Sequence, residues 1–376
     1  MRVPFHKPHN SGNELEYIRG AILSEKLSGD GVYTKRCHAL LSELGYNHPL
    51  LTTSCTDALE MAALMLDLQP GDEVIVPSYT FVSTASAFAM RGAKIMFADS
   101  QIDNPNIDSV EIAKLISPRT KAVVVVHYAG VACDLAAIQG VIGGADIALV
   151  EDAAQGIDSS YNGMPLGTIG RFGCLSFHDT KNISAGEGGA LIVNSVGDQQ
   201  RSEIIREKGT NRSAFVRGEV DKYGWVDLGS SFLPSELNAA YLLAQLENIS
   251  ETQKKRKVAW NAYSEALTDK LASVAVQLPV IPPFASNNAH MFYLVCRNGE
   301  ERNALMEHLN GIGVQAASHY HSLEKSRYYS TRYQGPALVN SERYTNCLIR
   351  LPLFTDIASD QVSFVSDGVL RFYGFD

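Results

Sequence analysis

A lysine between apolar and glycine-rich residues is the first candidate for chemistry in this chain. Lys181 follows the apolar run 174–177 and precedes the glycines of residues 186–189. Apolar surroundings disfavour the charged ammonium and lower the pKa of a lysine. A neutral lysine amine can form a Schiff base with a carbonyl compound. The competing interpretation is an exposed lysine beside a turn, so the rest of the chain must decide between the two.

A second candidate is the start of a predicted helix, where a phosphate can bind. Residues 54–57, Ser-Cys-Thr-Asp, stand immediately before the apolar, helix-like run 58–66. Ser, Thr and Asp at this place are typical N-caps. The free backbone N–H groups of a helix start also bind anions, phosphate included. The sequence therefore leaves two interpretations of Cys55 and Thr56 open, a plain cap and a phosphate site.

Other side chains of the sequence complete what a lysine Schiff-base site requires. Pyridoxal phosphate (PLP) withdraws electrons only while its ring nitrogen stays protonated, which takes a nearby carboxylate. Asp152 can supply that charge, and Gln155 follows it and can reach the ring hydroxyl. Phe81 can stack on the ring face, and Ser176 adds a hydroxyl for the phosphate.

These side chains need a scaffold, and the pattern of the first half of the chain predicts one. Short apolar runs, expected to be buried strands, alternate with helix-like segments of about 10 to 15 residues. The predicted strands cover residues 74–77, 94–98, 122–127, 147–150 and 191–194. Such alternation is typical of an α/β fold with a mostly parallel sheet. Because ligands bind at the carboxyl ends of parallel strands, Asp152 and His127 are predicted to lie near the site.

The rest of the chain is predicted to form a long loop, two helices and a second domain. Residues 209–231 are polar and loop-like, and a loop this long is commonly functional. Helices are predicted at residues 237–246 and 251–272. We expect a large PLP-binding domain over residues 1–248 and a smaller C-terminal α/β domain over residues 249–376.

Composition limits the classes of function open to the chain. Its 376 residues carry a net charge of −9, which argues against binding to nucleic acid. The six cysteines show no metal-ligand spacing, so no metal site is expected, and scattered thiols suit a reducing cytoplasm. No apolar run of about 18 residues predicts a membrane span, and the first residues lack the apolar core of a signal peptide. We therefore expect a cytoplasmic protein that does not associate with membranes.

Five motifs, by their order and spacing, resemble the sugar aminotransferases of the DegT/DnrJ/EryC1/StrS family. They are residues 54–56, 77–81, 151–155, 176–182 and 186–189. The resemblance covers nearly the whole chain and implies the PLP-dependent transferase fold type I, which is aspartate aminotransferase-like. It implies PLP as the cofactor and Lys181 as the catalytic residue, which binds the cofactor and moves a proton between substrate and cofactor carbons.

The resemblance also assigns the remaining cofactor contacts. Asp152 is expected to hold the pyridinium nitrogen, Gln155 the ring hydroxyl and Phe81 the ring face. The expected phosphate contacts are Cys55, Thr56 and Ser176. A neighbouring subunit completes the site in this family, so a homodimer with shared active sites is implied. The loop 209–231 is the segment expected to reach the partner.

Three further segments, residues 126–133, 206–213 and 288–293, favour a particular substrate within the family. They resemble enzymes that move an amino group from L-glutamate to C4 of a nucleotide-linked 4-keto-6-deoxy sugar. The implied reaction converts dTDP-4-keto-6-deoxy-D-glucose to dTDP-4-amino-4,6-dideoxy-D-galactose. The expected substrate contacts are Tyr79, Asn182, Arg212, Tyr223, Ser231, His319 and Tyr320.

The chain departs from the family pattern at two places. Many relatives carry an Asn in the segment that matches residues 229–233, where it reaches the partner's phosphate. This chain has none there, and Ser230 or Ser231 is the candidate substitute. The family's His-Tyr-x-Pro-Leu-His segment is His-Tyr-His-Ser-Leu-Glu at residues 319–324.

Several other functions compete with this interpretation. Amination at C3, or at C4 to the gluco epimer, requires only that the sugar be turned differently over the cofactor. A non-catalytic PLP-binding regulator would bind the cofactor without turnover. The family's dehydratases replace the cofactor-binding lysine with histidine, which the presence of Lys181 argues against. A nicotinamide-dependent oxidoreductase requires a Gly-x-Gly-x-x-Gly turn after a first strand, and the N-terminal region has none.

Overall fold

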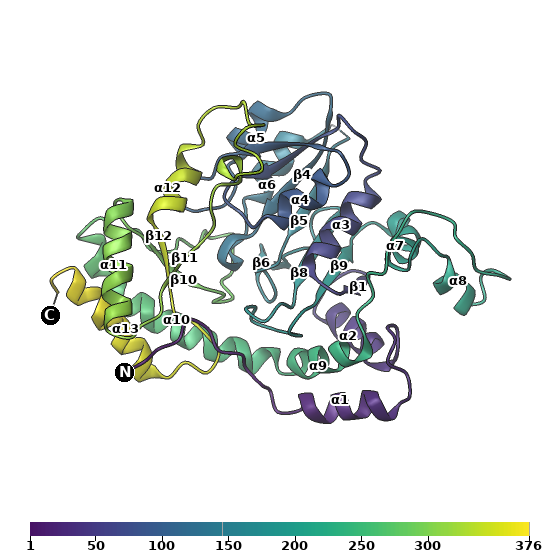
Figure 1. The fold of residues 1–376 in the computed structure, drawn as a ribbon, viewed down its shortest axis with the longest axis horizontal. Coiled ribbons are helices and arrows are strands. Elements are labelled where there is room, and N and C mark those ends of the chain that lie inside the picture. The colour runs from purple at the N-terminus through teal and green to yellow at the C-terminus, as the bar shows by residue number, and fades with distance from the viewer. Residues whose placement is uncertain (145, 376) are drawn as a thin grey trace.

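A seven-stranded sheet forms the centre of the computed structural model, which describes residues 1–144 and 146–375 (Figure 1). The strand order is β1-β9-β8-β5-β4-β2-β3. The strands are β1 (Pro49–Thr52), β2 (Glu73–Pro77), β3 (Lys94–Ala98), β4 (Thr120–Val126), β5 (Ala148–Asp152), β8 (Phe172–Ser176) and β9 (Gly189–Val193). Strands β8, β5, β4, β2 and β3 run parallel, whereas β9 pairs antiparallel with β8 and β1. The predicted α/β fold with a mostly parallel sheet is confirmed.

Alternating side chains of each central strand fill two separate cores, one on each face of the sheet. In β4, Ala122 and Val124 lie in one core, and Val123 and Val125 lie in the other. All four are fully buried, because a parallel sheet covered by helices on both faces has no wet side. For this reason the β4 sequence is a continuous apolar run rather than an alternating one.

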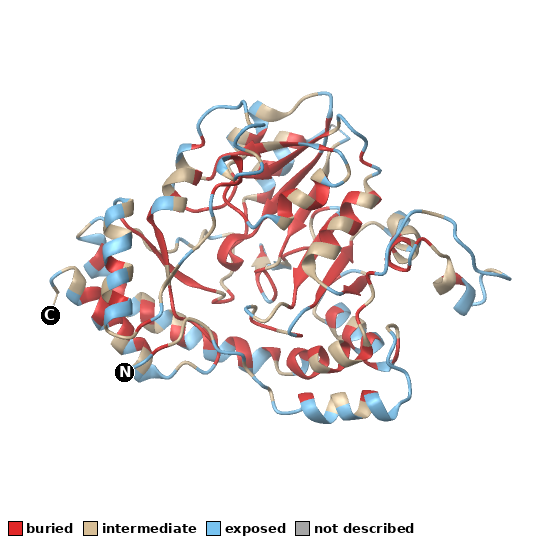
Figure 2. Cartoon of the chain, viewed as in Figure 1, coloured by how far each residue is buried: buried red, intermediate tan, exposed pale blue. Residues whose placement is uncertain are grey.

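Helices cover both faces of this sheet. The core around Val124 receives α3 (Cys55–Met65), α4 (Ser83–Ala89) and α7 (Gln199–Arg206). The core around Val123 receives α2 (Val32–Glu43), α5 (Ser109–Leu115), α6 (Leu135–Ile142) and α9 (Glu236–Glu247), with α1 (Glu14–Leu23) packed on α9. Figure 2 shows the buried residues concentrated along the sheet and on the inner sides of these helices.

A second, three-stranded antiparallel sheet lies beside the first (Figure 1). Its strands, in spatial order, are β10 (Phe292–Val295), β12 (Leu348–Leu351) and β11 (Ala317–Ser318). It shares a separate core with α10 (Ile249–Ala272), α11 (Gly299–Gly311) and α13 (Ser359–Phe372), and α12 (Val339–Cys347) precedes β12. A short hairpin, β6 (Ser160–Tyr161) and β7 (Met164–Pro165), completes the strands.

The predicted domain boundary falls between α9 and α10, and it stays a prediction. The first residues of the chain complicate it, because Val3 pairs with Val314 and is buried in the core of the smaller sheet. The N-terminal segment thus packs with the C-terminal part of the chain before α1 joins the large sheet.

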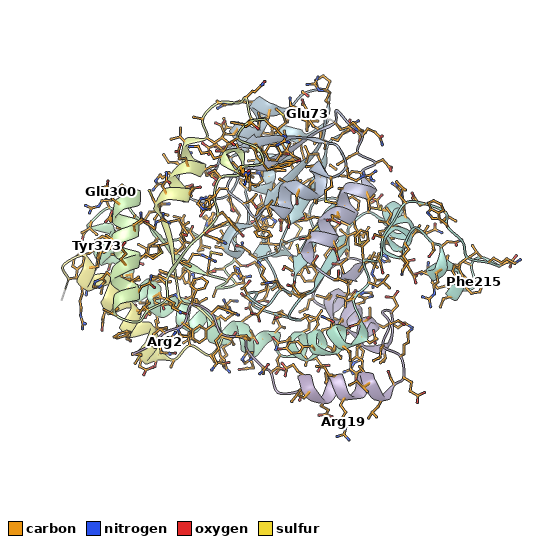
Figure 3. All side chains as sticks on the ribbon, in the orientation of Figure 1. Arg2, Arg19, Glu73, Phe215, Glu300 and Tyr373 are labelled. Carbon is orange, nitrogen blue, oxygen red and sulfur yellow. The ribbon has the colours of Figure 1, made fainter. Side chains whose placement is uncertain are left out.

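Residues 209–231 project from the body of the molecule, and we call this segment the arm (Figure 1). It contains one short helix, α8 (Arg212–Val216), where the sequence predicted only a loop. Phe215 points outward at the projecting end (Figure 3). The Trp225 side chain on the arm is 79% exposed and Val216 is 68% exposed. Large apolar side chains exposed on one projecting segment are a mark of a contact surface.

The described part of the chain contains no membrane-spanning helix and no metal-binding cluster. Within residues 1–144 and 146–375, no helix is long and apolar enough to cross a membrane. The same residues hold no group of His, Cys, Asp and Glu arranged to bind a metal ion. All six cysteines are free thiols.

Candidate active site

A cavity of about 620 Å³ opens at the carboxyl ends of β4, β5 and β8. Val126, Asp152 and Ser176, the last residues of these strands, all line it. Parallel strands bring their carboxyl ends to one edge of a sheet, where the diverging loops leave a crevice. The start of α3 contributes one wall, and β12 of the smaller sheet contributes another. The cavity therefore lies between the two parts of the fold.

Lys181 lies on the turn between β8 and β9 and lines the cavity. The turn is closed by the Phe177 N–H, which donates to the Gly188 carbonyl, and by the Ala185 N–H, which donates to the Phe177 carbonyl. Gly186 has a φ of +75°, a conformation that residues with a side chain rarely adopt. Burial lowers the pKa of the Lys181 amine and outweighs the opposing electrostatic effects of Cys55 and Asp152. The site thus contains an amine that is easily deprotonated.

Asp152 ends β5 and is buried in the same cavity. Its carboxylate accepts hydrogen bonds from the Thr84 hydroxyl at 2.7 Å and from the Ala154 N–H at 3.2 Å. Burial raises the pKa of Asp152 despite these bonds and the attraction of Lys181. The nearby groups do not fully compensate the carboxylate, so it is suited to pair with a cationic ring nitrogen.

The start of α3 combines a helix cap with an anion site. Ser54 Oγ accepts a hydrogen bond of 3.1 Å from the Asp57 N–H and acts as the cap. Cys55 and Thr56 follow it and line the cavity, where unpaired N–H groups and the positive end of the helix dipole favour an anion. Burial raises the pKa of the Cys55 thiol, so that no thiolate repels a phosphate. The cap and phosphate interpretations are therefore compatible.

Gly189, the first residue of β9, makes this arrangement sterically feasible. A Cβ at this position would lie 2.4 Å from the Ser54 carbonyl carbon and 2.5 Å from the Cys55 nitrogen. Only glycine permits such a close approach of two backbones. The glycine-rich segment after Lys181 therefore also positions the helix start.

Aromatic and amide side chains form the next part of the wall. Gln155 Nε2 donates to the Tyr320 hydroxyl at 3.2 Å. The Tyr320 ring stacks on His319 with 3.6 Å between centroids, and His319 Nδ1 lies 2.8 Å from the Tyr128 hydroxyl. Phe81 lines the cavity, is 56% exposed, and its ring centroid lies 6.3 Å from that of Tyr320. The structure thus brings Gln155, Phe81, His319 and Tyr320 together in the lining of one cavity.

Two predicted substrate contacts, Tyr79 and Asn182, lie behind the cavity wall. Tyr79 is 1% exposed, and its hydroxyl donates to the His319 carbonyl at 2.8 Å. Asn182 Nδ2 donates to Gln253 Oε1 and to the Asn288 carbonyl. Neither side chain lines the cavity, which corrects the expectation of direct contact with substrate. Both support the wall instead, because their polar groups are taken by neighbouring residues.

Three other predicted contacts lie on the arm or at its end and do not line the cavity of their own chain. Arg212 forms an ion pair with Glu207 at 2.8 Å, Tyr223 is 53% exposed, and Ser231 bridges to Glu207 through its backbone. Contact between these residues and an active site therefore requires a second copy of the chain.

His127 was predicted to lie near the site and is buried behind it. Its ring contacts Glu151, a residue to which the sequence analysis gave no role. The Cys133 N–H donates to His127 Nδ1 at 3.1 Å, which leaves Nε2 to donate to Glu151 at 2.9 Å. Glu151 also accepts hydrogen bonds from the Gly167 and Gly170 N–H groups. Neighbouring residues of a strand face opposite sides, so Glu151 anchors β5 from below while Asp152 faces the cavity. The alternation of facing along the strand is the sequence signal that could have identified the structural role of Glu151.

The part of the wall contributed by the N-terminal segment and the smaller sheet was also missed. The residues concerned are Phe5, His6, His290, Met291 and Arg350. No local motif marks them, apart from the segment 288–293 that contains His290 and Met291. They reach the cavity only because the chain folds back on itself.

The whole chain was then compared with known proteins. The DegT/DnrJ/EryC1/StrS aminotransferase family matches residues 8–370. The chain belongs to this family. This match confirms the resemblance that was inferred from the five motifs. It also confirms that the aminotransferase uses PLP.

Solved structures agree with this assignment. The aminotransferase is similar to TlmJ from Streptoalloteichus hindustanus, with 25% identity, 99% of both chains covered and a TM-score of 0.90. It is similar to S. venezuelae DesV, with 25% identity, 100% of this chain and 99% of that chain covered, and a TM-score of 0.89. The PLP form of Spr1654 from Streptococcus pneumoniae shares the fold, with 23% identity, coverage of 99% and 98%, and a TM-score of 0.88.

The cavity of the aminotransferase has the donor set that PLP requires. Lys181 offers an amine for the cofactor aldehyde, and Asp152 offers a buried carboxylate for the ring nitrogen. Cys55 and Thr56 offer the first turn of a helix for the phosphate. When bound, PLP supplies an electron sink for the carbon that gains or loses a proton.

Proposed function

We propose that this enzyme transfers the amino group of L-glutamate to C4 of dTDP-4-keto-6-deoxy-D-glucose. The product is dTDP-4-amino-4,6-dideoxy-D-galactose, an amino sugar of the kind used in enterobacterial common antigen. The observation that carries the proposal is the pairing of a readily deprotonated Lys181 with a buried Asp152 in one cavity. The substrate part rests on the resemblance of segments 126–133, 206–213 and 288–293.

In this proposal each cofactor contact has one task. Lys181 holds the cofactor aldehyde and afterwards accepts and returns the proton at its Nζ atom. Asp152 keeps the ring nitrogen protonated, and Gln155 contacts the ring hydroxyl. Phe81 covers the ring face. The phosphate is held by Cys55, Thr56 and Ser176, which line the cavity together.

The sugar contacts of the proposal come from two subunits. His319 and Tyr320 of the same chain line the cavity beside Gln155. We place Arg212, Tyr223 and Ser231 at the cavity of the second subunit of a homodimer. Support for this arrangement is the arm, which projects from the body and exposes large apolar side chains to water. The cytoplasmic location stays a prediction.

The test is incubation of the purified holoenzyme with L-glutamate and a panel of dTDP-, UDP- and GDP-linked 4-keto-6-deoxy sugars, followed by NMR of the product. We expect an amino group at C4 of a galacto sugar from the dTDP substrate, and no turnover by Lys181→Ala. An amine at C3, or at C4 of a gluco sugar, would contradict the proposed product and support one of the alternative aminotransferase reactions. Failure of L-glutamate to convert the cofactor to its amine form would contradict the proposed transamination.

A further inference from the structure

His290 lines the cavity from the segment that leads into β10. Its backbone is held on both sides, because the His290 N–H donates to Asn288 Oδ1 at 3.0 Å and the Arg256 guanidinium donates to the His290 carbonyl at 2.8 Å. Burial, followed by the charge of Lys181, lowers the pKa of His290 well below its ordinary 6.5. The imidazole is therefore neutral near pH 7, and one of its two ring nitrogens carries a lone pair.

A chain of amide groups determines which ring nitrogen of His290 carries the proton. The Asp158 carboxylate can only accept, so Gln253 Nε2, which lies 3.1 Å from it, is the donor and Gln253 Oε1 is left as an acceptor. Asn182 Nδ2 donates to this oxygen and to the Asn288 carbonyl, both at 2.9 Å. Asn182 Oδ1 is therefore an acceptor, and His290 Nδ1, 2.9 Å away, donates to it.

The other ring nitrogen, Nε2, is consequently an acceptor without a donor from the protein. Among the described residues, the ring of His290 makes one hydrogen bond, the one from Nδ1. Nε2 is not one of the unpaired polar atoms that the described chain encloses, so it opens to the cavity that the ring lines. A lone pair accepts from a hydroxyl or an amine, whereas carboxylates and phosphates are acceptors themselves. The ligand group at Nε2 is therefore a hydroxyl or an amine.

The chemistry of the proposed substrates distinguishes between these two groups. The amine of L-glutamate reacts with the cofactor and is not free to donate to the wall. In a 4-keto-6-deoxy sugar, C3 beside the reacting carbon carries a hydroxyl, whereas C5 on the other side carries a methyl group. The reacting carbon has to come close to Lys181, which lines the same cavity as His290. The C3 hydroxyl is thus the sugar donor nearest to the reaction.

We infer that His290 Nε2 accepts a hydrogen bond from the C3 hydroxyl of the sugar, in the tautomer that Asn182 imposes. This inference rests on the proposed function, because it presumes a 4-keto-6-deoxy sugar as substrate. The bond would fix how the sugar is turned over the cofactor. A 3-keto sugar bound in the same pose presents a carbonyl oxygen to the lone pair of Nε2, which is repulsive. His290 thereby favours amination at C4 over C3.

The experiment measures sugar binding by isothermal titration calorimetry to the holoenzyme loaded with pyridoxamine phosphate. The probes are dTDP-6-deoxy-D-glucose and its 3-deoxy analogue, which have no keto group and cannot react. His290→Asn keeps an amide N–H that can reach Asn182 but removes the acceptor at Nε2. His308→Asn is the matched control, because His308 is a partly exposed histidine of α11 that does not line the cavity. Cofactor stoichiometry and circular dichroism establish that each variant is folded.

We expect wild type to bind the probe with the C3 hydroxyl roughly 5- to 100-fold more tightly than the 3-deoxy analogue, the effect of a donor left without its acceptor. His290→Asn should bind the two probes within about twofold of each other, by weaker binding of the hydroxylated probe alone. His308→Asn should keep the wild-type preference. A merely structural role of His290 would weaken both probes equally and leave the preference unchanged.

Three results would overturn the inference. The first is a wild type without preference for the C3 hydroxyl, and the second is a folded His290→Asn that keeps this preference. The third is a proton on Nε2 of His290 in nitrogen-15 NMR of the histidine-labelled holoenzyme, because that nitrogen could not accept. The half-reaction with L-glutamate involves no sugar, so His290→Asn should convert the cofactor at the wild-type rate.

The proposed function is tested separately by turnover of the wild-type enzyme. If wild type prefers the C3 hydroxyl through His290 but transfers no amino group from L-glutamate to dTDP-4-keto-6-deoxy-D-glucose, the proposed function fails and the hydroxyl contact stands. If wild type forms the C4 amine but binds both probes equally, only the hydroxyl contact fails.

Discussion

Lys181 and Asp152 show how one environment prepares two side chains of opposite charge. Burial lowers the pKa of the Lys181 amine and raises the pKa of the Asp152 carboxyl, because the cavity disfavours both charged forms. Thr84 opposes this effect at Asp152 through its hydrogen bond. A cofactor with a protonated ring nitrogen compensates the carboxylate, while its aldehyde takes up the neutral amine.

Asp152→Asn tests the charge on the ring nitrogen. The variant keeps the size and the hydrogen bond from Thr84 but removes the negative charge, so proton removal from the substrate carbon should slow by at least about 100-fold. Rapid mixing with L-glutamate, followed through the visible absorbance of the lysine-bound cofactor, measures this step. Asp152→Glu retains the charge and serves as the comparison. Equal rates for wild type and Asp152→Asn would show that this carboxylate does not activate the cofactor.

Glu151 gives a prediction about pH and stability. Burial acts to raise its pKa, but hydrogen bonds from His127 and from backbone N–H groups outweigh burial and hold the pKa below the ordinary 4.5. A lowered folded-state pKa stabilises the fold fully above the unfolded value, and this stability is lost as the pH falls through the folded pKa. Glu151→Gln should therefore cost about 3 kcal/mol at neutral pH, and the difference from wild type should shrink below pH 4.5.

Urea unfolding of wild type and Glu151→Gln at a series of pH values measures this difference. Glu300→Gln, at an exposed position, is the control and should stay within about 0.5 kcal/mol of wild type. If the difference in unfolding free energy between wild type and Glu151→Gln is constant with pH, the carboxylate charge does not stabilise the fold.

At the scale of elements, the site depends on β9 and α3 touching through their backbones. Gly189→Ala would place a Cβ within 2.5 Å of Ser54 and Cys55 backbone atoms, so the helix start must shift. We expect a loss of about 1–3 kcal/mol in stability and a roughly tenfold loss of PLP affinity, because the anion site at the helix start is displaced.

Thermal unfolding and titration of the apoenzyme with PLP check both effects of Gly189→Ala. Gly140→Ala is the control, because its Cβ meets open space on α6, and it should bind PLP as wild type does. Unchanged PLP affinity in Gly189→Ala would show that the start of α3 does not hold the phosphate.

At the scale of the whole molecule, the arm is exposed in a single chain, and the proposed homodimer would cover it. Trp225→Asp introduces a charge at a residue that is 79% exposed, so a dimer that buries this surface should dissociate. We expect sedimentation velocity to show a monomer with much reduced turnover. Val196→Asp, at an equally exposed apolar side chain outside the arm (81%), should remain dimeric. A Trp225→Asp dimer of full activity would place the subunit contact elsewhere.

The sequence alone was enough to predict the cofactor side of the proposed site. Lys181, Asp152 and the start of α3 could be predicted because each lies at the end of a strand or helix whose apolar pattern is local. The parallel sheet then brings those ends together without further information. The family match confirms the use of PLP, whereas the assignments of individual residues stay predictions.

Only the tertiary structure decided the substrate side. Tyr79 and Asn182 belong to two of the sequence motifs, yet the turns that carry them direct their side chains behind the wall. Arg350 and Phe5 come from opposite ends of the chain and meet because Val3 pairs beside the smaller sheet. Local patterns specify helices and strands, whereas contacts between distant segments depend on how those elements pack.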